Sequence, residues 1–256
     1  MTETAMANQR VEPSDGKVMT VVEHLSELRR RLFIGILAVV IGAGVGFFLA
    51  PTAILILKAP ISGPLYFTAP SSAFFLQLKL ALMMGVALAS PILLYQLWAF
   101  ISPGLTPRER RLALPWVPLG LLFLLLGVGV AYFILPFAVG FMLGFAIPGV
   151  IDPLITADAY FGFVTNMFLA FGLVMEFPIV LVLLSRVGIV SAERLRKHRR
   201  YVFLGIFVFA VVVTPGGDPY SPTVMGAVMY LLYEFTIRLV ARGDKPKAQT
   251  PAEAAK

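Results

Sequence analysis

The sequence predicts an all-α integral membrane protein with six transmembrane helices. Hydrophobic residues make up 59% of its 256 residues, and charged residues only 14%. Soluble domains average about 45–50% apolar and about 25% charged residues, and a chain of this size cannot hide so much extra apolar surface in a water-soluble core. The apolar residues also form long continuous runs, which favour helices over the alternating pattern of a membrane β-barrel.

Six apolar runs are candidates to cross the bilayer, because a transmembrane helix needs about 20 mostly apolar residues. We expect the first helix to end at Pro51. The fifth run is stopped by Thr214-Pro215-Gly216-Gly217, and its apolar part covers only roughly 20 Å, less than a hydrocarbon core of about 30 Å. The predicted spans are residues 32–50, 74–100, 112–137, 160–184, 201–213 and 220–240.

The positions of lysine and arginine predict the orientation. With the N-terminus in the cytoplasm, every lysine and arginine except Lys58 and Lys79 falls on the cytoplasmic side. Cytoplasmic loops carry an excess of positive charge, so both termini are predicted to be cytoplasmic and the number of spans even. Polar composition predicts disordered cytoplasmic tails at 1–20 and 241–256, around a six-helix domain of residues 21–240. The apolar external segments 51–72 and 140–159 are predicted to lie on the membrane surface or to cap the bundle.

Composition argues against several classes of function. The net charge is +7, but no soluble basic domain that would bind nucleic acid is visible. The chain has no cysteine and only two histidines, His24 and His198, so we expect no catalytic centre, metal site or cofactor. Arg29-Arg30-Arg31 before an apolar run looks like a twin-arginine export signal, but no convincing cleavage site follows, which favours an uncleaved first helix.

Three glutamates are candidates for function. Glu176 lies about 12 Å from the inner end of the fourth run, where an acidic group costs about 2.5–3.5 kcal/mol. It should therefore face the bundle, a partner helix or a wet cavity, either as a functional group or as a polar contact that locks two helices. Glu27 has Arg31 four residues further along a helix, and Glu109 lies among arginines, so composition alone makes both ordinary surface charges. Asp218 is predicted to cap the sixth helix.

Several long motifs stand in the chain in a characteristic order. They are His24-Leu25-Ser26-Glu27-Leu28-Arg29, Ala89-Ser90-Pro91, Tyr95-Gln96-Leu97-Trp98-Ala99-Phe100-Ile101-Ser102-Pro103-Gly104-Leu105, Glu109-Arg110-Arg111, Phe171-Gly172-Leu173-Val174-Met175-Glu176-Phe177-Pro178 and Thr214-Pro215. Together these motifs resemble the TatC family, the Sec-independent, twin-arginine protein translocase subunit. The resemblance covers roughly residues 18–240. The chain departs from the family after Pro215, where two glycines precede Asp218, and at Pro222, where the family often has Gln.

The resemblance implies a receptor rather than an enzyme. TatC-like proteins bind twin-arginine signal peptides of folded proteins. With the single-span proteins TatA and TatB, they export this cargo across the bacterial plasma (inner) membrane, driven by the proton-motive force. The resemblance further implies a larger complex holding more than one copy of the chain, and a concave bundle with short fifth and sixth helices under an external cap.

The resemblance also implies roles for individual residues. Glu27 and Glu109 match the carboxylates that contact the paired arginines, and bidentate pairing with a carboxylate distinguishes arginine from lysine by geometry. Glu176 matches a carboxylate that meets a polar group of a partner helix. The other implied residues are His24, Arg29, Gln96 and Phe100 at the signal-peptide site, and Pro60, Pro215 and Asp218 in external loops.

Two other functions are compatible with the residues alone. A proton-coupled small-solute transporter would use Glu176 as its proton carrier and would need a pocket with several intramembrane polar groups, of which the chain offers few. A pure assembly scaffold would tolerate charge changes at Glu27 and Glu109, but changes on its helix faces would abolish assembly.

Overall fold

The computed structural model of the chain describes residues 21–104, 116–147, 149–186 and 190–243. Over these residues the structure is all-helical, with isolated bridges but no strand. The predicted tail 1–20 and residues 244–256 of the predicted tail 241–256 lie outside this part. The tail prediction is wrong for residues 241–243, which are helical. The elements are α1 (Val21–Leu57), α2 (Ser72–Ile101), the short 3₁₀ helix η1 (Ser102–Gly104), α4 (Trp116–Leu143), α5 (Ala157–Met175), α6 (Phe177–Arg186), α7 (Ala192–Lys197), α8 (Arg199–Val213) and α9 (Tyr220–Gly243).

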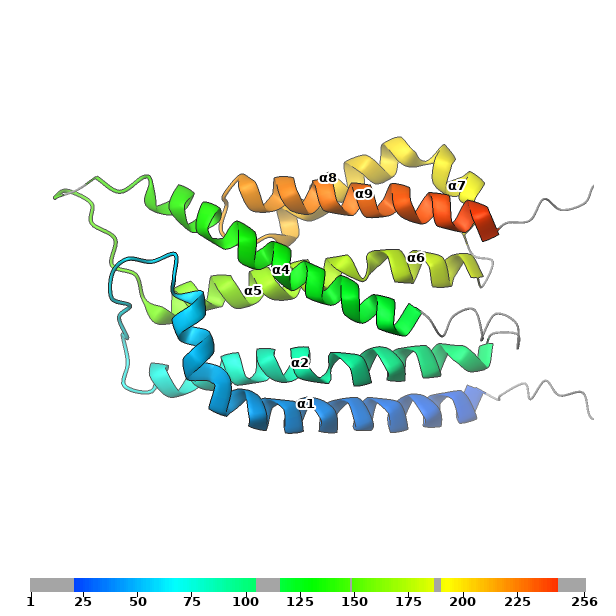
Figure 1. Ribbon diagram of the computed structural model, residues 1–256, viewed down its shortest axis with the longest axis horizontal. Coiled ribbons are helices and arrows are strands. Elements are labelled where there is room, and N and C mark those ends of the chain that lie inside the picture. The colour runs from blue at the N-terminus through cyan, green and yellow to red at the C-terminus, as the bar shows by residue number, and fades with distance from the viewer. Residues whose placement is uncertain (1–20, 105–115, 148, 187–189, 244–256) are drawn as a thin grey trace, which may run out of the picture.

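The long helices run along the long axis of the molecule (Figure 1). Helices α1 and α2 pack against each other at one edge, and α8 and α9 pack against each other at the opposite edge. Between them lie α5 and α6, with α4 crossing obliquely against α5. The start of α1 and the end of α9 lie at the same end of the molecule (Figure 1).

Five helical stretches in the described part are long and apolar enough to cross a membrane. The predicted fifth span corresponds to α8, which has 15 residues and is too short to be among them. The prediction of a short sixth helix is wrong, because α9 has 24 residues. Its sequence stays helix-compatible up to Gly243, and Pro222 falls near the start of the helix, where proline is tolerated. The five stretches are Val22–Leu57, Ser72–Ile101, Val117–Leu143, Ala157–Val182 and Tyr220–Ala241.

Two observed helix boundaries, both near prolines, differ from the predicted ones. Helix α1 does not end at Pro51 but continues to Leu57, and Figure 1 shows it turning sharply near that end. A proline inside a helix removes one hydrogen bond and bends the helix without having to end it. The predicted fourth span is divided at Glu176 into α5 and α6, because Pro178 has no N–H to donate to the preceding turn.

The core is centred on α5. Its side chains Phe161, Met167 and Phe171 are each at most 1% exposed, and the helix packs against α2, α4, α6 and α9. By contrast, α1 and α8 expose many large hydrophobic side chains. A mostly buried, mostly apolar helix surrounded by helices with exposed apolar surfaces is typical of a bundle that faces lipid.

Helices α1 and α2 approach so closely that their backbones touch. A Cβ atom placed on Gly42 of α1 would lie 2.8 Å from the carbonyl oxygen of Gly85 in α2, and one placed on Gly46 would lie 2.6 Å from the carbonyl oxygen of Ala81. Small residues four positions apart are the usual means by which membrane helices pack at such short range. This crossing fixes the position of α1 relative to α2.

The segments predicted as an external cap are joined to each other. The backbone of Tyr66 exchanges hydrogen bonds with the chain just before α5, accepting one from the N–H of Ala157 at 2.8 Å. Beside this bridge, the buried hydroxyl of Tyr160 donates to the carbonyl of Leu57 at 2.5 Å. Pro60 lies in the turn that follows α1. These bonds hold the end of α1 against the start of α5.

The turn between α8 and α9 contains the predicted cap. Asp218 is only 3% exposed, and its Oδ1 accepts a hydrogen bond from the N–H of Ser221 at 2.7 Å. The prediction that Asp218 caps this helix is therefore confirmed, and Pro215 lies in the same turn.

Two adjacent glycines in this turn should differ in their tolerance of alanine. Both have positive φ, +102° at Gly216 and +69° at Gly217, but only at Gly216 would a Cβ strike a neighbour, the ring of Phe163 at 2.6 Å. We expect Gly217→Ala to cost about 1–3 kcal/mol from backbone strain, and Gly216→Ala to cost a further 1–3 kcal/mol, roughly, from overpacking. Thermal unfolding of the two purified variants in detergent measures the difference; equal losses would show that contact with Phe163 is unimportant.

Candidate functional site

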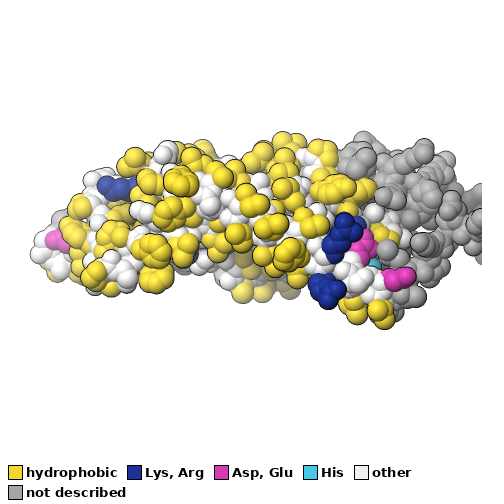
Figure 2. Space-filling model, turned by 90° about the horizontal axis from the view of Figure 1, so that it is seen from below, with side chains coloured by type: hydrophobic (Ala, Val, Ile, Leu, Met, Phe, Trp, Pro, Cys, Tyr) yellow, Lys and Arg dark blue, Asp and Glu magenta, His cyan; other side chains and the backbone are white. Residues whose placement is uncertain are grey.

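Charged side chains gather at the end of the molecule where α1 begins. Figure 2 shows this face as almost wholly hydrophobic over most of its length, with acidic, basic and histidine side chains together near that end. The charged residues here belong to the start of α1: Glu23, Glu27, Arg29, Arg30 and Arg31.

Glu27 and Arg31 form an ion pair that also reaches α2. The Nε of Arg31 donates to Oε1 of Glu27 at 3.0 Å, and its Nη2 donates to the same oxygen. The Nη1 of Arg31 donates to Oε1 of Gln96 at 3.2 Å. Residues four apart on a helix lie on one face, so the predicted pairing of Glu27 with Arg31 is confirmed. The contact with Gln96 joins two helices and was not predicted.

This ion pair is sheltered from solvent. The side chains of Arg31 and Glu27 are 23% and 15% exposed. The second carboxylate oxygen of Glu27, Oε2, is buried and has no hydrogen-bond partner among the described residues. A partly buried pair is screened less by salt than an exposed one, and a carboxylate with an unused oxygen has capacity to accept further hydrogen bonds.

A small polar cavity lies beside the pair. Its volume is about 260 Å³, which is enough for a guanidinium group. Most of its lining is polar, so a hydrogen-bonding ligand fits it better than an apolar one. The lining residues are Glu27, Arg30, Arg31, Ile34, Tyr95 and Gln96.

A ring contact closes the same end of the two helices. His24 of α1 stacks on Phe100 of α2, with ring centroids 4.4 Å apart and planes 18° apart. Four of the residues implied by the family resemblance, namely His24, Glu27, Gln96 and Phe100, are therefore brought together from two helices. Arg29 follows Glu27 on α1 and is exposed, and Glu109 lies outside the described residues.

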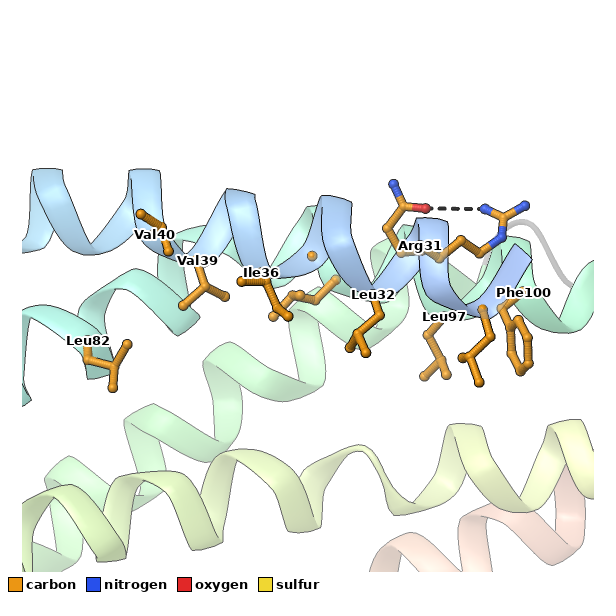
Figure 3. Close-up of a pocket in the computed structure, with 12 residues that line it drawn as sticks. Arg31, Leu32, Ile36, Val39, Val40, Leu82, Leu97 and Phe100 are labelled. Carbon is orange, nitrogen blue, oxygen red and sulfur yellow. Dashed lines mark hydrogen bonds between the residues drawn. The ribbon is translucent and has the colours of Figure 1, made fainter. Parts of the chain in front are cut away.

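An apolar groove extends from the polar cavity along α1 and α2. Its volume is about 430 Å³, and it shares Arg31 and Gln96 with the polar cavity. Figure 3 shows the Arg31–Gln96 hydrogen bond at one end of the groove and apolar side chains along its length. Those labelled are Leu32, Ile36, Val39 and Val40 of α1, and Leu82, Leu97 and Phe100 of α2.

Glu176 forms a separate polar point inside the bundle. It lies at the junction of α5 and α6 rather than within one continuous helix. Both of its carboxylate oxygens are buried and have no hydrogen-bond partner among the described residues. Its Oε2 lies 3.1 Å from the position that a Cβ of Gly120 in α4 would take. A glycine at this position of α4 therefore leaves room for the carboxylate.

The sequence and the fold match known proteins over most of the chain. The sequence model of the family described as Sec-independent protein translocase protein (TatC) matches residues 23–227. The chain belongs to the TatC family. A TatC of Carboxydothermus hydrogenoformans is 37% identical over 237 residues, which cover 91% of this chain and 97% of that protein. The TatC of Escherichia coli K12 is 38% identical over 225 residues, covering 84% of this chain and 86% of that protein.

Solved TatC structures share this fold. The crystal structure of a twin-arginine translocase receptor TatC in DDM superposes with a TM-score of 0.74 at 37% identity, covering 85% of this chain and 99% of that one. A second crystal structure of a twin-arginine translocase receptor TatC gives a TM-score of 0.73 at 36% identity. Membership of the TatC family makes the chain a multi-pass membrane component of protein transport. The small-solute transporter finds no support among these relatives.

Proposed function

We propose that this TatC-family protein is the receptor core of a twin-arginine translocase and that it binds the paired arginines of signal peptides on folded cargo at the α1–α2 end. The observation that carries the proposal is a sheltered carboxylate, Glu27, beside a polar cavity of about 260 Å³. A guanidinium pairs with a carboxylate through two parallel hydrogen bonds, which lysine cannot reproduce. We propose Glu109 as the carboxylate for the second arginine.

The neighbouring residues fit the same ligand. We propose that Gln96 supplies an amide oxygen for a guanidinium N–H, and that the stacked rings of His24 and Phe100 wall the site. Signal peptides carry an apolar stretch of about 7–15 residues after their positive segment. The apolar groove runs along α1 from Leu28 to Val40, roughly 18 Å of helix, which suits part of such a stretch. Arg29 is proposed to position the ligand from the exposed side.

The rest of the proposal concerns architecture and partners. We propose six spans with α8 as a short fifth one, both termini in the cytoplasm and an inner-membrane location. The start of α1 and the end of α9 at one end of the molecule support this topology, as does the distribution of lysine and arginine. We propose structural roles for Pro60, Pro215 and Asp218 in turns at the other end.

The proposed complex contains further subunits. We propose that TatA and TatB are the single-span partners, that several copies of the chain assemble together, and that the proton-motive force drives export. Glu176 is the proposed contact for a polar group of a partner helix, because its buried carboxylate has two unused oxygens and buried polar groups are normally hydrogen-bonded.

Replacing Glu27 by glutamine tests the receptor function. We expect Glu27→Gln to weaken binding of a fluorescent twin-arginine signal peptide to the purified full-length protein in detergent by roughly 10- to 100-fold, because a charge-assisted hydrogen bond contributes about 1.5–3 kcal/mol. A twin-lysine peptide should bind the wild type more weakly, because an ammonium group cannot form the two parallel hydrogen bonds, and it should also lose affinity in the variant. Anisotropy titrations measure both peptides.

The matched control is Glu23→Gln, which removes the same charge one helical turn earlier on the exposed surface of α1. It should change affinity less than about three-fold, since exposed charges contribute about 0.2–1 kcal/mol. Full-strength, arginine-selective binding by a well-folded Glu27→Gln protein would contradict the receptor site and favour the assembly scaffold.

A further inference from the structure

We propose that Arg31 is a built-in competitor of the signal peptide: its guanidinium occupies the Glu27 carboxylate, and a ligand guanidinium binds only by displacing it. This inference rests on the receptor function proposed above. Under this inference, Arg31 of the receptor itself sets the affinity of the site for the signal peptide.

Neither oxygen of Glu27 is accessible to an arriving guanidinium while Arg31 is in place, although Oε2 has no hydrogen-bond partner among the described residues. Oε1 already accepts hydrogen bonds from both Nε and Nη2 of Arg31. Oε2 is buried away from the surface. An arginine arriving from outside therefore reaches neither oxygen until the side chain of Arg31 moves. With the ion pair formed, the site is closed. The group that closes it is a guanidinium, the same group that the site is proposed to bind.

A second anchor strengthens the closed form. The Nη1 of Arg31 donates to Gln96 on α2 at 3.2 Å, so Arg31 bonds two of the residues that a ligand arginine would use. Each of its three nitrogens is engaged. Displacing Arg31 therefore breaks a contact within α1 and a contact between α1 and α2 together.

The space around Arg31 can accommodate its side chain after displacement from Glu27. Arg31 is 23% exposed and lines both the polar cavity and the apolar groove. Arginine has a long flexible stem that packs along apolar surface while its charged head moves to water. Because Arg31 stands where the two cavities meet, its departure from Glu27 also joins them into one channel from the carboxylate to the apolar groove.

Such a competitor lowers affinity without changing selectivity. If the open form is only a small fraction of the population, the apparent affinity of every ligand is reduced by that fraction. The cost of moving Arg31 is the same for an arginine peptide and a lysine peptide. The preference for arginine over lysine then depends on the opened site alone. Removing Arg31 should therefore raise the affinity for both peptides by the same factor.

The test is Arg31→Gln in the full-length protein, titrated in detergent with the twin-arginine and twin-lysine peptides. We expect both to bind roughly ten-fold more tightly, with the ratio of their affinities unchanged within about two-fold. Arg196→Gln is the matched control, because it removes the same charge from an exposed arginine of α7 at the same end of the molecule that lines neither cavity. It should change affinity less than about three-fold.

Two further variants keep the outcome decisive. Arg31→Lys retains the charge but has a single nitrogen, which holds Glu27 and Gln96 less well together, so it should give an intermediate gain even if Arg31→Gln does not fold. In a Glu27→Gln background, Arg31→Gln should add nothing, because there is no carboxylate to release.

The results separate this inference from the receptor function. Suppose that the wild type binds with dependence on Glu27 and with arginine selectivity, but that Arg31→Gln and Arg31→Lys bind equally well or more weakly. This result would overturn the competitor role of Arg31 and leave the receptor function supported. An equal gain in affinity for Arg196→Gln would mean that the effect comes from general charge, and it would also overturn the competitor role of Arg31. Wild-type protein that shows no Glu27-dependent binding would overturn the receptor function itself.

Discussion

Replacing Gly42 by leucine is expected to cause a large loss of stability. The backbones of α1 and α2 are in contact there, with the position of a Gly42 Cβ only 2.8 Å from the carbonyl oxygen of Gly85. Backbone cannot move aside as a flexible side chain can, so the helices must separate along their length. Overpacking typically costs about 1–3 kcal/mol, and we expect at least the upper end of that range.

The consequence should reach the binding site. Glu27 and Gln96 are held at their present separation by the packing of α1 on α2, so Gly42→Leu should also weaken binding of the twin-arginine peptide. Thermal unfolding and peptide titration of the same detergent sample measure both effects. Gly42→Ala should give a smaller loss of stability in the same direction.

Gly44 provides the control on the same helix. A Cβ at Gly44 would meet nothing within 4 Å, and leucine is a better helix former than glycine by up to about 1 kcal/mol. Gly44→Leu should therefore leave stability unchanged or slightly raised. If the two leucine variants unfold at the same temperature, close packing of α1 on α2 does not hold the fold together.

Replacing Glu176 by leucine is expected to stabilise the isolated protein and abolish transport. Neither carboxylate oxygen has a hydrogen-bond partner among the described residues, and leaving a buried polar group unsatisfied costs about 1–3 kcal/mol, or more for a charged one. Leucine has a similar volume and no polar atom, so that cost disappears. Transport should fail because a partner helix loses the polar group that it is proposed to contact.

Three measurements on the Glu176 variants check this prediction. The unfolding temperature in detergent should rise for Glu176→Leu, co-purification with the single-span partners should fall, and binding of the twin-arginine peptide should be unchanged. Glu176→Gln keeps the shape and the hydrogen bonding, so it should retain part of the partner assembly. Normal transport by Glu176→Leu, or loss of peptide binding with assembly intact, would contradict the proposed role.

Much of the fold follows from the sequence, because apolar runs in a membrane protein have few alternatives to a helix. Ser72–Ile101 and Arg199–Val213 lie within a few residues of the predicted spans. Two of the errors occur at prolines, where local rules are ambiguous: a proline bends α1 at Pro51, whereas the helix is interrupted just before Pro178. Which outcome occurs depends on the tertiary contacts available to the freed carbonyls, and these are not visible in a single sequence.

The candidate site was only partly predictable. The pairing of Glu27 with Arg31 follows from their spacing on one helix. The bond from Arg31 to Gln96 does not, because it depends on the register of α1 against α2, and the glycines at their crossing set that register. Small residues in a membrane helix indicate close packing. Gly42, Gly46 and Gly85 were therefore the sequence signal that α1 and α2 pack closely enough for Arg31 to reach Gln96.

The length of α1 determines the medium in which recognition takes place. The helix is continuous for 37 residues, and its part before Pro51 alone is roughly 45 Å long, against a hydrocarbon layer of about 30 Å. Glu27 lies about 8 Å along the helix before Leu32, where the apolar run begins. We therefore expect the carboxylate to sit at the depth of the lipid headgroups. Ion pairs are stronger there than in bulk water, and anionic lipids concentrate cationic peptides at that depth. A signal peptide that has adsorbed to the membrane would then reach Glu27 by a two-dimensional search along the surface.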